Sequence, residues 1–344
     1  MSIPTPFPYK GEMLCSALAR QMRYLYIQKY HTFAKLVDFP LYTLSRAYST
    51  TMVEYFYKSL DRVIELKRLL LENTLFPLLT LFDHDVILNF INNNGIENLS
   101  KMSNNNSSVS LKNTDIDALF ERRKYSINSI DLLKDIQFSS NYKRLKKYFC
   151  YCPQCFHEQM SLYNERYWLL EWQIPVIKIC AIHRCPLIST NFRIYVANKL
   201  FDASTIAFDN VSEIVPDPHS DIIADTVHSI LTTKEIKWHL SIEWMDFFCS
   251  LATSLGYKVY KKFQKRHMYL YKFEGIRESA IKYWGSWLSI YAPNIFLFGE
   301  WMRPTGDWLR NFVILKAIDP NATMASAIES MENVTALSGN VWDW

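Results

Sequence analysis

Five of the seven cysteines lie in one short stretch of the chain, from Cys150 to Cys185. Two pairs stand out because two residues separate their members: Cys152 from Cys155, and Cys180 from His183. This gap lets both members of a pair reach one ion from a tight turn, and Zn²⁺ prefers thiolate and imidazole ligands. The spacing therefore predicts one structural Zn²⁺ ion, bound by Cys152, Cys155, Cys180 and His183.

The four predicted ligands would fill every coordination position of the zinc ion, which argues against a catalytic role for it. A catalytic zinc keeps one position open for water, whereas four protein ligands fill the tetrahedron. Glu158 and Glu165 are the nearby candidates for a base, and neither lies in an HExxH arrangement. We therefore expect no catalytic residues and no enzymatic activity, and a zinc hydrolase or nuclease is a remote alternative.

Three other residues of this stretch are weaker candidates for the metal. Cys150 and Cys185 flank the two pairs, but their spacing is out of phase with a CxxC pair, so they rank as rival ligands. We expect His157 to be an ordinary surface or core histidine. The alternative for the whole stretch is a set of buried cysteines without metal, because a free thiol packs as a small apolar group.

The elements that must position these ligands are expected to be mainly helical. Between the two pairs, Tyr163, Tyr167, Trp168 and Trp172 are spaced as on one helical face that ends before Pro175, which predicts a short helix packed on the metal site. Downstream, residues 191–197 have strand character, and residues 220–233 and 240–255 are expected to be helices.

The N-terminal part shows helical periodicity from residue 11 onward. Apolar residues recur at helical spacing between positions 14 and 25, and a second face carries Glu12, Ser16, Arg20 and Arg23. Two interpretations of that face stay open: an intramolecular ion-pair stripe, or contact of the arginines with a phosphate or an acidic partner. A second long helix is expected over residues 53–68, and another segment opens at Pro77.

These patterns predict a mainly α fold with a small zinc-knuckle module. We expect a helical N-terminal domain of helix-turn-helix type over residues 1–95 and an Asn/Ser-rich linker or loop over residues 96–114. The zinc-knuckle module follows over residues 115–200, and a helical C-terminal region covers residues 201–344.

Two basic stretches are candidates for contact with the phosphate backbone of DNA. The first directly precedes the cysteines, and the second, within residues 257–273, alternates with aromatic residues. Most charge runs are only solvated surfaces, and a surface helix with inward-facing aromatic residues gives the second pattern too. The predicted contacts are Arg122, Arg123, Lys124, Lys143, Arg144, Lys146, Lys147, Lys258, Lys261, Lys262, Lys265 and Arg266.

The composition narrows the class of protein. Of the 344 residues, 49% are hydrophobic and 21% are charged, which is typical of a globular protein. Neither GxxxxGK[ST] nor GxGxxG occurs, so the chain is not expected to be an ATPase of the usual kind. The net charge of +4 permits contact with nucleic acid without predicting strong binding.

The sequence has no signal pattern and no apolar run of about 18 residues, so we expect a cytoplasmic protein without membrane contact. In that compartment thiols stay reduced, so we expect the cysteines to bind metal rather than form disulfides.

Three ordered landmarks resemble the TniQ/TnsD family of bacterial transposition proteins over about residues 5–190. The first is Phe7-Pro8-Tyr9 followed by ExLxSxxAR from Glu12, and the second is TLFP at residues 74–77. The third is CPxC at 152–155, an aromatic YW…EWQxP segment, and CxxHxxPL at 180–187.

The resemblance implies a non-enzymatic target-site selector or adaptor that contacts double-stranded target DNA and recruits an AAA+ ATPase regulator of the TnsC type. In the TniQ branch it implies coupling to a CRISPR RNA-guided effector complex, and in a bacterial cell it implies association with the nucleoid. Two departures favour the adaptor role. No cysteine pair follows Cys185, and the chain ends about where the DNA-reading region of TnsD-type proteins begins. The alternative is a stand-alone, sequence-specific, zinc-containing DNA-binding protein.

Overall fold

The computed structural model describes residues 4–38, 50–60, 66–75, 77–78, 81, 146–194, 199–205, 211–232, 241–264, 268–288, 302 and 308–337. These residues fall into two compact units. The first unit contains the described residues between 4 and 77 and between 146 and 232, and the second contains residues 78 and 81 and those between 241 and 337. The predicted linker over residues 96–114 lies outside the described residues.

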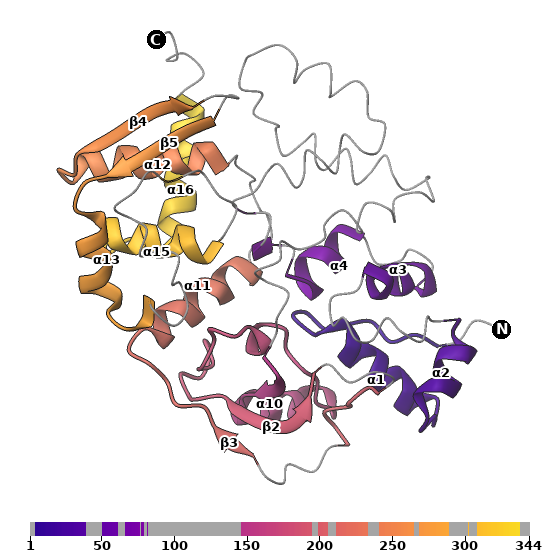
Figure 1. Cartoon of the computed structure of the whole chain (residues 1–344). Helices are drawn as coiled ribbons and strands as arrows, with labels where there is room; N and C mark the ends of the chain where they lie inside the picture. Colours follow the sequence, from indigo (N-terminus) through magenta and orange to yellow (C-terminus); the bar gives the residue numbers. More distant parts are fainter. Residues whose placement is uncertain are drawn as a thin grey trace, which may run out of the picture. The chain divides into compact units, whose positions relative to one another are not determined.

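The N-terminal part of the first unit contains α1 (Leu14–Tyr24), α2 (Tyr30–Leu36), α3 (Thr50–Ser59) and α4 (Leu66–Asn73) (Figure 1). The predicted first helix is confirmed as α1, which buries nine of its eleven residues. Most of its polar face is therefore buried as well, including Ser16 and Arg20. Where one long helix was expected over residues 53–68, the structure has α3 and the start of α4, and residues 61–65 lie outside the described part.

The remainder of the first unit surrounds the cysteine stretch. It contains β1 (Tyr148–Tyr151), α10 (Pro153–Tyr163), the 3₁₀-helix η4 (Glu171–Gln173), β2 (Ile188–Arg193), β3 (Ser212–Glu213) and α11 (Ser220–Thr232). The three strands form an antiparallel sheet in the order β1-β2-β3. The strand expected at 191–197 is therefore present as β2, shifted toward the N-terminus. Helix α11, which the sequence analysis placed in the C-terminal region, belongs to this first unit.

The aromatic run between the two ligand pairs is not one helix, contrary to expectation. Helix α10 ends at Asn164, which adopts a left-handed conformation with φ of 55°. Asparagine tolerates this conformation better than most residues, so it ends helices as glycine does. Tyr163 thus ends a helix, Trp168 lies in the following loop, and Trp172 lies in η4.

These aromatic residues nevertheless form the core behind the cysteine stretch. Trp168 and Trp172 are completely buried, and the ring of Trp168 stacks on Phe149 with centroids 4.6 Å apart. Gln173 holds η4 against β1 through two hydrogen bonds with the backbone of Cys150, one in each direction, at 2.9 and 2.8 Å. A buried side-chain amide whose oxygen and nitrogen both form hydrogen bonds holds the groups around it in place. Gln173 therefore fixes the position of β1, which leads directly into the first cysteine pair.

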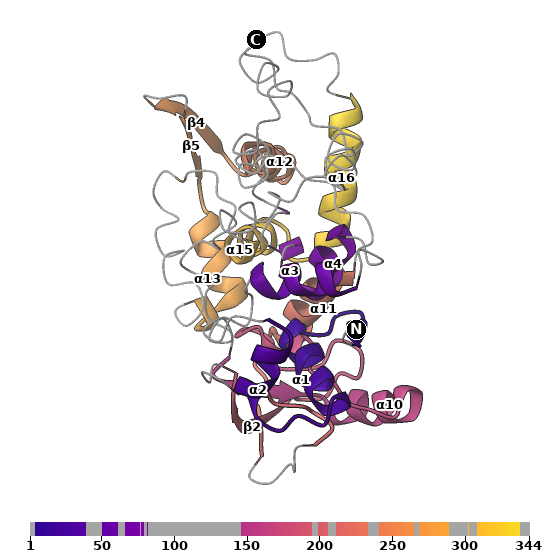
Figure 2. The same cartoon turned by 90° about the vertical axis from the view of Figure 1, so that its right-hand side faces the viewer.

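The second unit contains α12 (Ser241–Ser254), β4 (Val259–Gln264), β5 (Met268–Phe273), α13 (Ile276–Trp284), α15 (Trp308–Ile318) and α16 (Met324–Leu337) (Figure 2). Large buried rings form its core: Trp244, Phe248, Tyr271, Trp284 and Phe312.

The helical C-terminal region expected from the sequence also contains two strands, because β4 and β5 form an antiparallel hairpin. Two residues after the end of α12, Gly256 adopts a left-handed conformation with φ of 86°, which stops the helix from continuing. The next residues include valine, tyrosine and phenylalanine, which favour a strand over a helix. The mainly α prediction thus holds only in part, since small antiparallel sheets accompany the helices. Among the described residues, none of the helices is long and apolar enough to span a bilayer.

Candidate metal centre

The four predicted ligands meet at one point of the first unit. The Sγ atoms of Cys152, Cys155 and Cys180 and the Nδ1 or Nε2 atom of His183 all lie within 4.8 Å of one another. The Sγ atoms of Cys155 and Cys180 are 3.6 Å apart, and His183 Nδ1 lies 3.2 Å from Cys155 Sγ and 3.5 Å from Cys152 Sγ. Within the described part of the chain, this is the group of His, Cys, Asp and Glu side chains that could hold a metal ion.

These separations fit a tetrahedral zinc ion. With Zn–S bonds of about 2.3 Å and a Zn–N bond of about 2.0 Å, ligand atoms at tetrahedral angles lie about 3.8 Å apart for two sulfurs and about 3.5 Å apart for sulfur and nitrogen. The donor set, three thiols and one imidazole, is also one that zinc favours.

Local backbone structure explains why each pair can bind from one turn. Cys152 is the N-cap of α10, where its Sγ accepts a hydrogen bond from the Cys155 amide at 3.5 Å, and Pro153 occupies the first helical position. In the second pair, the amide of Arg184 donates to the Cys180 carbonyl at 2.9 Å, and Arg184 has a left-handed φ of 55°. Both ligand pairs are therefore fixed by hydrogen bonds to their own backbone.

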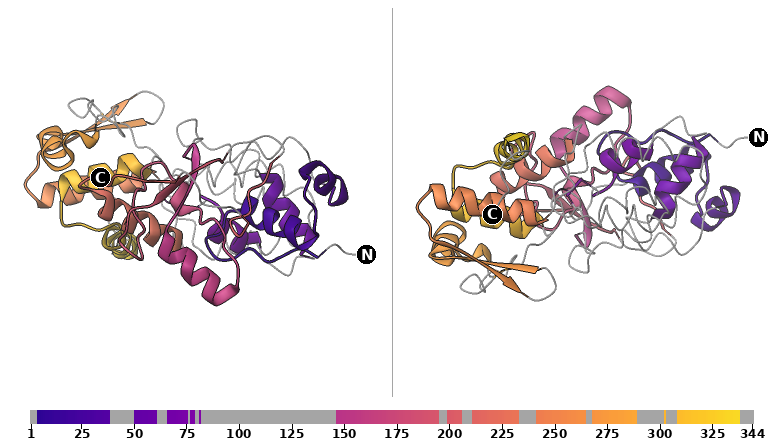
Figure 3. Two further views of the ribbon diagram at one scale, coloured as in Figure 1. Left: turned by 90° about the horizontal axis from the view of Figure 1, so that it is seen from below. Right: turned by 90° about the horizontal axis from the view of Figure 1, so that it is seen from above.

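Contacts outside the ligand set orient the site. His183 Nε2 lies 2.9 Å from Glu158 Oε1, which leaves Nδ1 directed at the three sulfurs. A carboxylate on the second ring nitrogen is the usual way in which a metal-binding imidazole is oriented. Glu158, considered as a catalytic base from the sequence, thus contacts a ligand. Helix α10, which carries Glu158, projects away from β2 and α1 (Figure 3).

The rival ligands take other positions. Cys150 is buried in β1, and its Sγ lies 3.5 Å from the Tyr148 carbonyl. Cys185 is half-buried, and its Sγ lies 3.4 Å from Cys152 Sγ. His157 is exposed on α10 and lies outside the group of four.

Lys146 contributes to the fold behind the metal centre. Its ammonium group donates to the Trp172 carbonyl at 2.8 Å and to the Ile177 carbonyl, and burial lowers the pKa of Lys146 to about 8. An ammonium group engaged in this way is directed away from solvent, so Lys146 is not carried into the proposed DNA contacts. Lys147, by contrast, is exposed, with its Nζ 5.2 Å from the centroid of the Tyr148 ring.

The other predicted basic contacts are only partly described. Lys258, Lys261 and Lys262 are exposed on or beside β4. Lys261 pairs with Asp246 of α12 at 2.9 Å, and Lys258 lies 3.9 Å from Glu274. The remaining seven lie outside the described residues: Arg122, Arg123, Lys124, Lys143, Arg144, Lys265 and Arg266.

The polar face of α1 is an ion-pair network, which decides between the two interpretations left open by the sequence. The guanidinium group of Arg20 donates to Glu12 at 2.8 and 3.0 Å and to Glu165 at 2.8 Å, and these three side chains are at most 5% exposed. Arg23 pairs with Glu165 and Asp202 at 2.6 and 2.5 Å. The network joins α1 to the segment between the two ligand pairs.

Hydrogen bonds keep Glu165 charged inside this network. Burial alone would raise the pKa of its carboxyl, but hydrogen bonds from the hydroxyls of Tyr24 and Tyr9 and from Arg23 outweigh burial and lower it. Glu165 was a candidate base from the sequence, and the structure instead shows it as the shared partner of two arginines. Sequence reasoning missed Asp202, because 179 positions separate it from Arg23.

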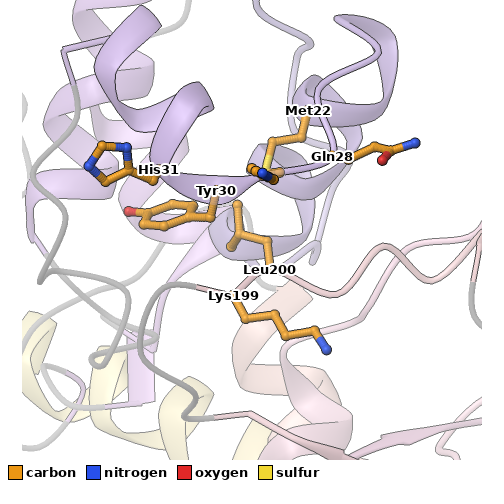
Figure 4. A pocket seen from close by; sticks show the side chains of 7 residues that line it. Met22, Gln28, Tyr30, His31, Lys199 and Leu200 are labelled. Atoms are coloured by element: carbon orange, nitrogen blue, oxygen red, sulfur yellow. The ribbon is translucent and has the colours of Figure 1, made fainter.

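A pocket of about 440 Å³ opens beside α1 and α2 (Figure 4). In the view of Figure 4, Met22 and Leu200 lie centrally, the polar ends of Gln28 and Lys199 point to one side, and Tyr30 and His31 lie on the other. The lining contains two lysines and a histidine and no acidic residue, so it favours an anion. The lining residues are Met22, Gln28, Lys29, Tyr30, His31, Lys199 and Leu200. No sequence pattern identified this group, because the fold brings together residues about 170 positions apart.

The pair between His228 of α11 and Glu171 of η4 gives a pH-dependent prediction. Nδ1 of His228 lies 2.8 Å from the Glu171 carboxylate, and this hydrogen bond raises the pKa of His228. The stabilisation is fully present below about pH 6.5 and is lost as the pH rises through the raised pKa. With zinc held saturating, we expect denaturant titrations to show a free energy of unfolding that falls over this range and a flatter profile for His228→Gln. The exposed His31→Gln should keep the wild-type slope, and an equal slope in His228→Gln would contradict the assignment.

Comparison with known proteins places the site within a family. No curated protein matches the chain. The TniQ family matches residues 3–187, more than half of the 344 residues, and this range contains all four metal-binding candidates and the Glu12–Arg20–Glu165 ion pairs. Membership of this family implies involvement in transposition, and its members are transposition adaptors rather than known enzymes. The four-donor cluster, and the ion pairs that join α1 to the segment between its two ligand pairs, thus lie in a chain that belongs to the TniQ family of transposition proteins.

Proposed function

We propose that this protein is a non-enzymatic target-site selector or adaptor in Tns-type DNA transposition. In this role it contacts target DNA and recruits an AAA+ ATPase regulator of the TnsC type to the insertion site. The observation that carries the proposal is the four-donor cluster inside the TniQ-matching range, which forms a closed ligand set and whose intervening segment is joined to α1 by the ion pairs of Glu165.

The chemistry of the cluster supports a structural role for its metal. Four protein donors complete a zinc tetrahedron, so the residues of the site leave no position at which water would be activated. The two nearby acids that could serve as a base have other roles: Glu158 contacts His183, and Glu165 pairs with Arg20 and Arg23. These contacts favour an adaptor over a zinc hydrolase or nuclease.

Two exposed surfaces are proposed to contact the DNA. The first is strand β4 together with Lys258, which directly precedes it. On this strand, Lys261 and Lys262 lie beside the exposed rings of Tyr260 and Phe263. A two-stranded ribbon fits the major groove, and lysines beside it neutralise phosphates. The second is the pocket of Figure 4, whose Lys29, His31 and Lys199 suit a backbone phosphate.

The proposal is tested by binding to a duplex from the transposon's attachment site and to a scrambled duplex, with and without the cognate ATPase and ATP. An adaptor should bind weakly and without sequence preference by itself and form a stable complex only with the ATPase or with an RNA-guided effector complex. Tight, site-specific binding by this chain alone would support the alternative, a stand-alone sequence-specific DNA-binding protein.

Replacing Lys258, Lys261 and Lys262 with alanine is expected to weaken DNA binding and to flatten its salt dependence. Removing one lysine that neutralises a phosphate should lower the slope of log K against log salt by about 0.9, or by about 2.7 if all three lysines do so. Fluorescence anisotropy at several salt concentrations measures both the affinity and the slope.

The matched control replaces Arg277 and Lys282 of α13, which are exposed in the same unit. This variant removes two positive charges elsewhere on the second unit and should keep the wild-type slope. Equal losses of affinity in both variants would indicate an effect of net charge alone and would argue against β4 as the contact surface.

A further inference from the structure

Cys185 places a further thiol beside the group of four donor atoms, in contact with Cys152. Its Sγ lies 3.4 Å from Cys152 Sγ, which is as close as the ligand sulfurs lie to one another. A thiol in contact with a metal-bound thiolate can either stabilise it by an S–H···S hydrogen bond or react with it.

The two sulfurs differ in their access to solvent, although the backbone holds them together. Cys152 is completely buried, whereas Cys185 is partly exposed. The turn that carries Cys185 is fixed by a hydrogen bond of 2.9 Å from the Cys180 amide to the Cys185 carbonyl and by an ion pair of 2.6 Å between Arg184 and Asp225 of α11. The contact between the two sulfurs is therefore part of the folded structure.

We propose that Cys152 and Cys185 form an oxidisable pair, and that a peroxide converts them to a disulfide with release of the metal ion. In the first step, the accessible Cys185 thiol reacts with hydrogen peroxide to give a sulfenic acid and water. In the second step, the Cys152 thiolate leaves the metal and attacks Cys185 Sγ, and hydroxide leaves. In total, one peroxide is reduced to water and hydroxide, and two sulfurs are oxidised to one disulfide.

Exposure selects this pair over the pairs that the buried sulfurs of Cys152, Cys155 and Cys180 could form among themselves. Cys155 and Cys180 are 3.6 Å apart, but both are buried and both are ligands. Oxidation follows accessibility as well as thiolate character, so the first reaction falls on Cys185.

Formation of the disulfide removes one of the four ligands. Cys155, Cys180 and His183 would remain as three donors, an incomplete set for a structural zinc. Loss of the ion would then unfold the part of the first unit that depends on it. The proposal does not depend on any role of the chain in DNA binding.

The test treats the purified, zinc-loaded full chain with hydrogen peroxide and follows zinc release with a chromogenic chelator. Peptide mapping by mass spectrometry then locates the disulfide. We expect release of one zinc per chain together with a Cys152–Cys185 disulfide, and recovery on addition of reductant and zinc. Cys185→Ser should bind one zinc as the wild type does but release it several-fold more slowly.

Cys249→Ser is the matched control, because Cys249 is also half-buried but lies in α12 of the second unit. It should release zinc at the wild-type rate. Three results would overturn the proposal: wild-type release from Cys185→Ser, a mapped disulfide between Cys155 and Cys180, or Cys185→Ser purified without zinc, which would make Cys185 a ligand. If Cys185→Ser fails to fold, the peptide map of the oxidised wild type decides the question.

Discussion

Replacing Cys152 with serine is expected to abolish zinc binding and to unfold the first unit. Cys152 has two roles in this prediction, because it is one of the four candidate ligands and also the N-cap of α10. A structural zinc contributes about 10–16 kcal/mol in small zinc domains, which is comparable to the whole stability of about 5–15 kcal/mol of a typical protein. Elemental analysis should find less than one zinc per chain, and circular dichroism should show that much of the cooperative thermal transition is lost. His183→Ala should behave in the same way, because it removes the fourth ligand.

The same experiment contains its own control. Cys15 is also a buried cysteine but lies in α1, so Cys15→Ser should lower stability only modestly and keep one zinc per chain. A strong chelator added to the wild type should reproduce the unfolding, and added zinc should reverse it. Normal zinc content with a normal melting curve in Cys152→Ser would refute the four-ligand assignment.

Replacing Arg20 with alanine is expected to destabilise the first unit by about 3–5 kcal/mol, because the buried carboxylate of Glu12 would lose its charged partner and that of Glu165 would lose one of its two arginines. The guanidinium group makes hydrogen bonds to both carboxylates and to the Phe7 carbonyl at 2.9 Å, and it lies 4.3 Å from the centroid of the Tyr9 ring. Arg20→Lys should recover only part of the loss, since one ammonium group cannot reproduce this planar set of donors. Denaturant titration at neutral pH measures both values.

An exposed arginine on a neighbouring helix serves as the comparison. Arg68 pairs with Glu72 at 3.0 Å across one turn of α4, and its side chain is 53% exposed. Surface pairs of this kind contribute about 0.3–0.5 kcal/mol, so Arg68→Ala should change stability by about that amount. Losses of similar size in the two variants would contradict the interpretation that burial makes the Arg20 network costly to break.

The group of four possible metal-binding side chains could be predicted from the sequence because each pair is local. Two intervening residues already determine whether two side chains can share one ion, and only the meeting of the two pairs required the fold. The polar face of α1 could also be recognised from the sequence, but the partners of its arginines could not. Glu165 and Asp202, which turn that face into an ion-pair network, lie 145 and 179 positions from Arg20 and Arg23.

The errors in secondary structure have equally specific causes. The aromatic residues from Tyr163 to Trp172 match a helical period by coincidence, and the left-handed Asn164 interrupts the helix within that run. In β4 the consecutive Lys261 and Lys262 break the alternation that usually indicates a strand, since both faces at this position are exposed. The pocket beside α2 had no signal at all in the sequence.

The ion-pair network also has a consequence for the order of folding. Cys155 and Cys180 are 25 residues apart, whereas Arg20 and Glu165 are 145 residues apart. Closing the longer loop costs more chain entropy, and contacts between distant residues form later than local ones. We therefore expect the metal-bound segment to form first and to present Glu165 as a ready-made partner, and α1 to dock afterwards. Helix α1, although synthesised before the cysteine stretch, would be among the last parts of this unit to reach its native position.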